Sequence, residues 1–526
     1  MDELLKNVIE IKYVDIKKLK LSFFFTYFLG FLAHGFSFFN LQLSHDCLAE
    51  FMLSYNWKIR LGRYLKPIYD IFFGKFISLP WINGLMLLFW LSLSAYLVVE
   101  MFNIQRKSHI AIICGIMSTN ITVIALNATY LHDACANMFC LFITILGVYF
   151  WSKLFEAKNN RNKLLLIVGS ILSVFISLAI YQAYISVYIS LVLIVSILKL
   201  LDSYEIPSWK HVWRNDIIGA IICLLGGGLY YIGLKIVLSI TGLTLNEGNY
   251  NSLTNLSKNG EPLLDRITKA FTQFFDYFLH AKGFVYPDSF PRIIFILLFV
   301  TAMISFAFII VQLIHKKVSI INVFSSILFL FLLPFSMNLM RLLNEYIHDL
   351  MVYAYWFIYI FFFLLIIKVS KMNYRKLLET FSSLLLCILI IINVQVANAT
   401  YADKALSQQA TFSVMTRIVD KIESFDEYIP GDTPVTFIGT PSSYLKEFQD
   451  FVNFSRISGI DVSTITYQQV YPKYISLILK LDMNVVLNGY LYDNNILDYF
   501  NLNKMPCYPA KDSIQFVNGV VIVKFE

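Results

Sequence analysis

Acidic, basic and imidazole side chains gather in one segment that directly follows the first long apolar run. This segment, SHDCLAEFMLSYNWKIRLGRYLKP (residues 44–67), holds the carboxylates Asp46 and Glu50 and then the basic residues Lys58, Arg60, Arg63 and Lys66. A carboxylate here could accept a proton from an attacking hydroxyl, and the Arg63 guanidinium could stabilise charge on a departing phosphate. The same pattern is typical of an amphipathic helix at the membrane interface, whose Lys and Arg reach lipid phosphates. Composition alone favours this interfacial helix.

A second cluster is TYLHDACANMF (residues 129–139), where His132 and Asp133 occupy a turn too short to be a domain. An Asp in this place can simply cap the helix that follows. Because His45 precedes Asp46 in the same way, two His–Asp pairs could together bind a divalent metal, although oxygen-rich Mg²⁺ and Mn²⁺ sites seldom use histidine. The sequence leaves a metal open and assigns no cofactor.

Three weaker signals lie farther along the chain. Tyr181 and Gln182 end an apolar run, where an aromatic residue at the membrane interface is common. Three glycines at 226–228 favour close helix packing over a helix break. Arg341 is the one basic residue of its outer turn and is the best further candidate for contact with a phosphate.

The elements that must position these residues are membrane helices. The chain is 58% hydrophobic and only 15% charged, whereas soluble domains carry roughly 25% charged residues. The apolar residues fall in long blocks, which is typical of a polytopic α-helical membrane protein. We expect about eleven spans, near residues 21–39, 79–101, 109–127, 134–152, 163–181, 184–201, 217–240, 292–314, 318–335, 351–368 and 377–397.

Lys and Arg concentrate in alternate short loops, which predicts that the N-terminal segment 1–20 is cytoplasmic. The first span should remain as an anchor, and an odd number of spans puts the C-terminus outside. The longer outer loops then cover residues 40–78 and 241–291 of a membrane domain spanning 21–397. The formal net charge of +7 does not indicate nucleic-acid binding, since the basic residues lie at membrane ends.

Residues 398–526 have no apolar run long enough to span and carry turn signals such as IPGDTP. Three segments read as strands and KYISLILKL (473–481) as a helix between them. We therefore expect a small extracytoplasmic α/β domain, with strands at TPVTFIG (433–439), MNVVLNG (483–489) and NGVVIVKF (518–525).

The order of these motifs resembles the GtrII-type glucosyltransferases, bacterial serotype-modifying enzymes of the GT-C class. The resemblance rests on HD at 45–46, Trp57 followed by Gly62-Arg63, the YLHD turn at 130–133, the Tyr181-Gln182 pair and the closing segment TYADKALSQQATFSVMTRIVDKIE. Each motif is short, but together they cover nearly the whole chain.

The resemblance implies an inverting transfer of a sugar, usually glucose, from an undecaprenyl-phosphate donor to a surface polysaccharide such as O-antigen. The reaction would take place at the outer face of the bacterial cytoplasmic membrane, with membrane lipids around the protein. Asp46 matches the catalytic base, Asp133 the second-loop acid and Arg63 the loop-one arginine. The family often has two acids where this chain has His45-Asp46, and Leu350 stands where an arginine is expected, so that Arg341 is a possible substitute.

The remaining candidates are Lys66 for the donor phosphate and, for substrate contact, His45, Glu50, Trp57, His132, Tyr181 and Gln182. Two other functions fit the same composition. A transporter or flippase for a lipid-linked saccharide would also need cationic grooves and aromatic residues, but not obviously a folded outer domain. A non-catalytic assembly protein could use its C-terminal domain to bind a partner.

Overall fold

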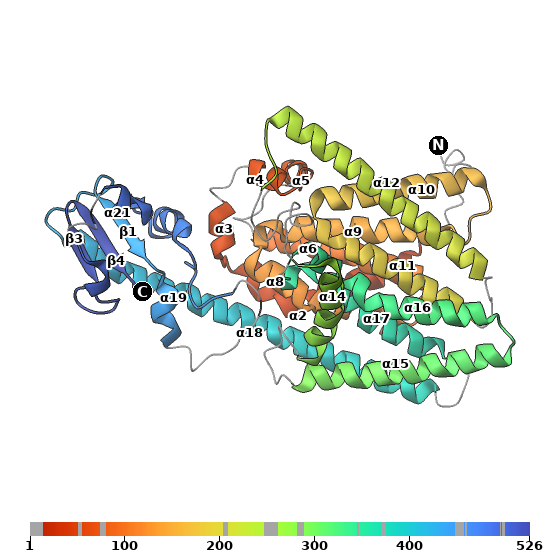
Figure 1. The fold of residues 1–526 in the computed structure, drawn as a ribbon. Helices are drawn as coiled ribbons and strands as arrows, with labels where there is room; N and C mark the ends of the chain where they lie inside the picture. The colour runs from red at the N-terminus through yellow and green to blue at the C-terminus, as the bar shows by residue number, and fades with distance from the viewer. Residues whose placement is uncertain are drawn as a thin grey trace.

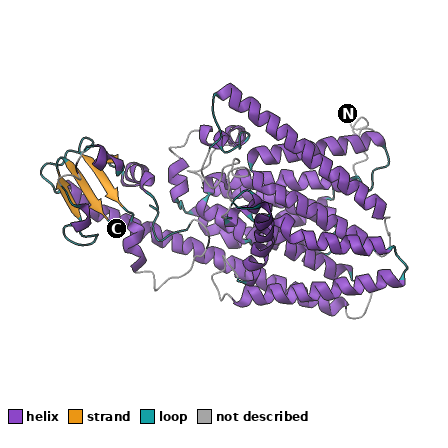
Figure 2. Ribbon diagram, viewed as in Figure 1, coloured by secondary structure: helices purple, strands orange, loops and turns teal. Residues whose placement is uncertain are grey.

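A long helical bundle carries a smaller α/β domain at one end (Figures 1 and 2). The computed structural model describes residues 14–50, 55–73, 80–202, 209–246, 261–280, 289–344, 347–369, 375–447, 457, 460–494, 496 and 500–526. The predicted class, a polytopic helical membrane protein with a small C-terminal α/β domain, is confirmed.

Ten helical segments within the described residues are long and apolar enough to cross a membrane. They are α2 (Ile16–Phe39), α6 (Pro80–Met101), α7 with α8 (Lys107–Thr119, Ile121–Thr129), α9 (Leu131–Lys153), α10 (Asn160–Ile180), η1 with α11 (Gln182–Tyr184, Ile185–Leu200), α12 (Trp209–Thr241), α15 (Ser289–His315), α16 (Ile320–Met337) and α18 (Arg375–Glu423). The shorter apolar helix α17 (Tyr353–Lys368) matches the one remaining predicted span, 351–368.

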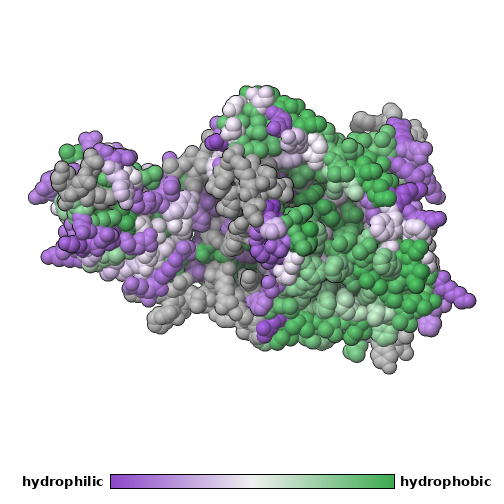
Figure 3. Space-filling view, viewed as in Figure 1, coloured by the Kyte–Doolittle hydropathy of each residue, from purple (hydrophilic) through white to green (hydrophobic). Residues whose placement is uncertain are grey.

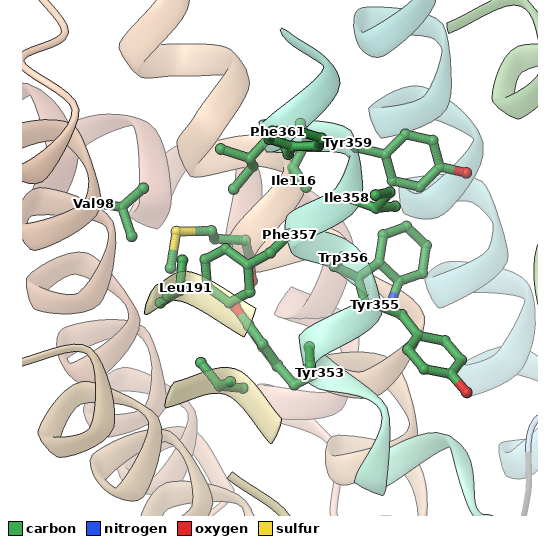
Figure 4. Close-up of a cluster of buried hydrophobic side chains, with 14 of the residues drawn as sticks. Val98, Ile116, Leu191, Tyr353, Tyr355, Trp356, Phe357, Ile358, Tyr359 and Phe361 are labelled. Atoms are coloured by element: carbon green, nitrogen blue, oxygen red, sulfur yellow. The ribbon is translucent and has the colours of Figure 1, made fainter. Parts of the chain in front are cut away.

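Helix α17 forms the centre of the bundle. Its residues from Tyr353 to Ile366 are all buried, as expected for a helix that is apolar on every side. In Figure 4, Phe357 points toward Leu191 of α11, while Tyr355 and Tyr359 point to the opposite side. Tyr355 packs edge-to-face against Phe274, with ring centroids 5.1 Å apart.

The outside of the bundle is an apolar belt with polar surfaces at both ends (Figure 3). Large apolar side chains of α12 and α15 remain exposed on it, including Leu224, Ile240 and Ile314. At the end away from the α/β domain, Lys18 pairs with Glu100 at 3.0 Å. The bundle is therefore polar at its ends and apolar in between, as a bilayer requires.

The α/β domain contains a four-stranded sheet in the order β2-β1-β4-β3. Strand β1 (Pro434–Ile438) pairs in parallel with β2 (Asn484–Val486) and with β4 (Val520–Lys524), while β3 (Ile514–Val517) is antiparallel to β4. The three expected strands and the helix over 473–481 are present, the latter as the end of α20 (Tyr471–Tyr474) and the π-helical segment Ile475–Leu479. Short helices α19 (Pro441–Leu445) and α21 (Gly489–Asp493) complete the domain.

Strand β3 was not predicted from the sequence. The Asn518-Gly519 pair, which we placed inside one strand, is the hairpin turn between β3 and β4, and both residues have positive φ, 47° and 81°. Such a pair between two β runs is a strong hairpin signal.

The two longer segments that we expected outside the membrane both contain helices. The expected interfacial helix is found as three short helices within the described residues, α3 (His45–Glu50), α4 (Tyr55–Arg60) and α5 (Lys66–Phe73). Gly62, with φ of 77°, turns the chain between α4 and α5, a conformation that costs glycine little. In the second of these segments, α14 (Leu263–Leu279) lies against the bundle.

Candidate active site

The segment after α2 and the turn before α9, both of which we expected outside the membrane, meet at the end of the bundle that carries the α/β domain. Cys47 of α3 is fully buried, and its Sγ lies 3.7 Å from Nδ1 of His132, in the first turn of α9. Ser44 donates a hydrogen bond of 2.5 Å to the carbonyl of Thr129, just before α9. These contacts place the two predicted His–Asp pairs on neighbouring elements.

Asp133 lies in a buried cluster of charges. Its carboxylate is 2.7 Å from the ammonium of Lys58, 3.1 Å from that of Lys66 and 3.4 Å from Nε2 of His132. Lys66 also reaches Asp70 at 2.6 Å. Buried charges are tolerated when they are paired in this way. Burial lowers the pKa of Lys66, but Asp133 and Asp70 raise it by more, so the ammonium stays charged.

This cluster changes the interpretation of two predicted residues. Lys66, expected beside a donor phosphate, is 3% exposed and its ammonium lies between two carboxylates. Asp133 is similarly surrounded by cations. Lys58, which we had treated only as one basic residue of an interfacial helix, is buried and pairs with Asp133. Lys58 and Lys66 lie four residues before and after Gly62, which turns the chain. This arrangement is the signal in the sequence that could have predicted that both lysines pair with the same carboxylate.

Asp46 has a different environment. Its side chain is 31% exposed and lies 3.6 Å from Nε2 of His45. The His45 ring packs edge-to-face against Tyr467 of the α/β domain, with centroids 5.7 Å apart. Burial lowers the pKa of His45, and the nearby charge of Asp46 offsets only part of this effect. A neutral imidazole therefore stands beside an accessible carboxylate.

A third His–Asp pair lies close to the first. His348 and Asp349 precede α17, and the charges of Asp46 and His45 both act on the His348 ring. The carbonyl of Asp349 accepts a hydrogen bond of 2.8 Å from Thr122 in α8. This pair was not predicted, although the His-Asp dipeptide that recurs at 45–46, 132–133 and 348–349 is a signal for it in the sequence.

Arg63 lies over the ring of Tyr181, with its guanidinium carbon 4.4 Å from the centroid. Its Nε is buried and has no hydrogen-bond acceptor among the described residues. Gln182 fixes the neighbouring backbone by donating to the carbonyl of Leu61 at 3.3 Å, and it donates to the hydroxyl of Tyr230 at 3.0 Å. The structure therefore brings together three predicted residues, Arg63, Tyr181 and Gln182.

Arg341 lies in a separate cluster. It is 3% exposed, and its guanidinium pairs with Glu261 at 2.9 Å and donates to the carbonyl of Asn344 at 3.3 Å. Lys269 of α14 binds the same carboxylate. In this arrangement a protein carboxylate, rather than an open surface, faces the guanidinium of Arg341.

The last predicted residues are Trp57 and Glu50. Trp57 is partly buried on α4, and Glu50 ends α3, with its side chain outside the described residues. No group of three or more His, Cys, Asp or Glu side chains that could hold a metal ion occurs in the described part of the chain.

Comparison with known proteins gives one match. The family model "Glucosyl transferase GtrII" matches residues 35–354, which is more than half of the chain and runs from the last turns of α2 to the start of α17. Every predicted site residue lies within this range. No curated protein matches the chain, and no solved structure matches it either. The chain therefore belongs to the GtrII glucosyltransferase family, and it is a membrane protein whose family transfers glucosyl groups to cell-surface glycans.

Proposed function

We propose that the protein transfers glucose from a polyprenyl-phosphate donor, such as undecaprenyl-phosphate glucose, to a cell-surface polysaccharide, with inversion at the anomeric carbon. The reaction would take place at the outer face of the bacterial cytoplasmic membrane. The observation that carries this proposal is the contrast between two acids. Asp46 is 31% exposed beside a neutral His45, whereas Asp133 is buried among cations.

Asp46 is the proposed general base. It accepts the proton of an acceptor hydroxyl, and the hydroxyl oxygen attacks the anomeric carbon from the face opposite the phosphate. The bond from the anomeric carbon to the phosphate oxygen breaks, and the polyprenyl phosphate leaves with the electron pair. A phosphate leaving group needs charge stabilisation more than protonation.

Arg63 is the proposed phosphate contact. Its stacking on Tyr181 fixes the plane of the guanidinium. Its buried Nε has no acceptor among the described residues, so the Nε–H group can donate a hydrogen bond to a phosphate oxygen. Arginine suits this role because its planar fork binds two phosphate oxygens at once. The polyprenyl tail would lie in the bilayer beside the apolar belt.

Asp133, His132 and Lys66 are proposed as positioning residues. The Asp133 cluster ties α4 and α5 to the start of α9, and Arg63 lies in the turn between α4 and α5. Lys58 and Lys66 flank this turn and add positive charge near it while they remain paired with their carboxylate partners. Arg341 would hold the second outer loop through Glu261.

The test uses the purified protein in liposomes with undecaprenyl-phosphate [¹⁴C]glucose, and with UDP-glucose as the competing donor class. The acceptor is the surface polysaccharide extracted from the host strain after deletion of the gene. We expect transfer from the lipid donor only, with an anomeric configuration in the product opposite to that of the donor. Transfer from UDP-glucose alone, or retention of configuration, would contradict the proposal.

A further inference from the structure

The α/β domain adds a polar wall beside Asp46. A small cavity of about 20 Å³, with room for about one water molecule, lies between the membrane domain and the segment 460–467, and we call it the junction cavity. Its polar lining comes from both domains and consists of Ser44, His45, Lys404, Ser407, Asp461, Ser463 and Thr464. Hydroxyl, carboxylate, imidazole and ammonium groups are the partners that sugar hydroxyls use for hydrogen bonds.

The junction cavity continues into a larger groove. This groove, of about 340 Å³, shares Leu43 and Thr464 with the junction cavity. We call it the interdomain groove, and its further lining residues are Leu41, Gln408, Gln409, Phe412, Tyr474 and Ile478. Its size falls within the roughly 300–1,000 Å³ of ordinary ligand sites, and aromatic side chains next to amides can cover the apolar face of a sugar and bind its hydroxyls.

The walls of both cavities are fixed to each other. Thr411 of α18 donates to the Ser463 hydroxyl at 3.2 Å and accepts from the amide of Thr464 at 3.0 Å. Lys404, one wall of the junction cavity, is buried and donates to the carbonyls of Gln42 and Ala128. The α/β domain is therefore held against α18 and the first outer loop at the edge of the site.

The position of the groove argues for a water-soluble ligand. Lys404 of α18 donates a hydrogen bond to the carbonyl of Ala128, at the outer end of α8. Phe412 lies eight residues farther along α18, which places it roughly 12 Å farther from the bundle than Lys404. The groove therefore opens away from the apolar belt. A polyprenyl tail would have to leave the bilayer and expose its CH₂ groups to water to reach it, which is unfavourable.

We propose that the acceptor polysaccharide binds in the interdomain groove and follows the polar wall of the junction cavity, so that its terminal sugar presents a hydroxyl to the exposed carboxylate of Asp46. This inference rests on the proposed function. It gives the α/β domain the task of holding the acceptor, while the membrane domain holds the donor. Gln409 and Phe412 are then specificity residues that contact the acceptor several sugars from the reacting hydroxyl.

The test is acceptor kinetics of the full-length protein in liposomes, with undecaprenyl-phosphate glucose as donor and the polysaccharide of the gene-deleted strain as acceptor. Gln409→Ala and Phe412→Ala remove two exposed groove side chains. Thr416→Ala is the matched control, since Thr416 is exposed one turn farther along the same helix and does not line the groove. In the absence of acceptor, the rate at which glucose is released from the donor by hydrolysis measures donor binding and cleavage alone.

For both variants and their double mutant we expect a five- to tenfold or greater rise in KM for the polysaccharide, with KM for the donor and the hydrolysis rate unchanged. Thr416→Ala should match the wild type. An unchanged acceptor KM in the double mutant would overturn the inference, and a rise in donor KM instead would assign the groove to the lipid. A wild-type protein that neither transfers nor hydrolyses the lipid donor would refute the proposed function itself.

Discussion

At the scale of the residue, burial separates side chains that the sequence presents as equivalent. Asp46 and Asp133 both follow a histidine at the outer end of an apolar run. The sequence predicted that these acids lie near the membrane surface, and their elements do meet. It could not predict that Lys58 and Lys66 turn inward to pair with Asp133, because this depends on the folded path of the loop around Gly62.

Asp133→Asn should lower the free energy of unfolding by about 3–5 kcal/mol, because removing one member of a buried ion pair leaves charges without compensation. Thermal unfolding in detergent measures this loss. Asp265→Asn, an exposed acid on α14, is the control and should leave Tm unchanged. Equal Tm values for both variants would show that the cluster does not stabilise the fold.

His348 should make stability depend on pH. Burial lowers its pKa below the usual 6.5, so below that pH the folded protein binds fewer protons than the unfolded chain, and the free energy of unfolding falls as pH falls. His348→Gln should therefore lose less Tm than the wild type when the pH falls from about 7.5 to 5.5. Above the usual histidine range, His348 is neutral in both the folded and the unfolded protein, so the substitution should not change how Tm depends on pH. His280→Gln, at a largely exposed histidine, should keep the wild-type slope, and an identical slope in His348→Gln would contradict the argument.

At the scale of the element, long apolar runs predicted all the membrane helices, because their length and composition leave few alternatives. The end of α18 was harder to predict. We placed a boundary at residue 398, but the helix continues to Glu423, and its apolar residues there form one stripe, Val414, Met415, Ile418 and Ile422, against the sheet. The end of the apolar run marked the end of the membrane segment rather than the end of the helix.

The glycines of α12 offer a test of helix packing. A Cβ on Gly226 would lie 2.7 Å from Val174 and 3.1 Å from the carbonyl of Ile171, whereas a Cβ on Gly227 would meet nothing within 4 Å. Gly226→Ala should separate α12 from α10 and cost about 1–3 kcal/mol. Gly227→Ala should be neutral or stabilise by up to about 1 kcal/mol, since alanine favours a helix. Tm values in the reverse order would contradict the close packing at Gly226.

At the scale of the whole molecule, eleven crossings place the start of α2 and the α/β domain at opposite ends of the bundle. Cys507 is an exposed cysteine of that domain. Labelling of its thiol therefore shows on which side of the membrane the domain lies. In spheroplasts, a membrane-impermeant maleimide should label the wild type but not Cys507→Ser. Labelling of Cys507 only after the membrane is permeabilised would place the domain in the cytoplasm and reverse the proposed orientation.

The central claim is that Asp46 is the base for glucosyl transfer, and one rate measurement tests it. With the lipid donor and polysaccharide in liposomes, Asp46→Asn should lower the transfer rate by about 10²–10⁴-fold, the usual contribution of a general base, with the wild-type Tm retained. Asp265→Asn should transfer at the wild-type rate. An Asp46→Asn protein with full activity would contradict the account.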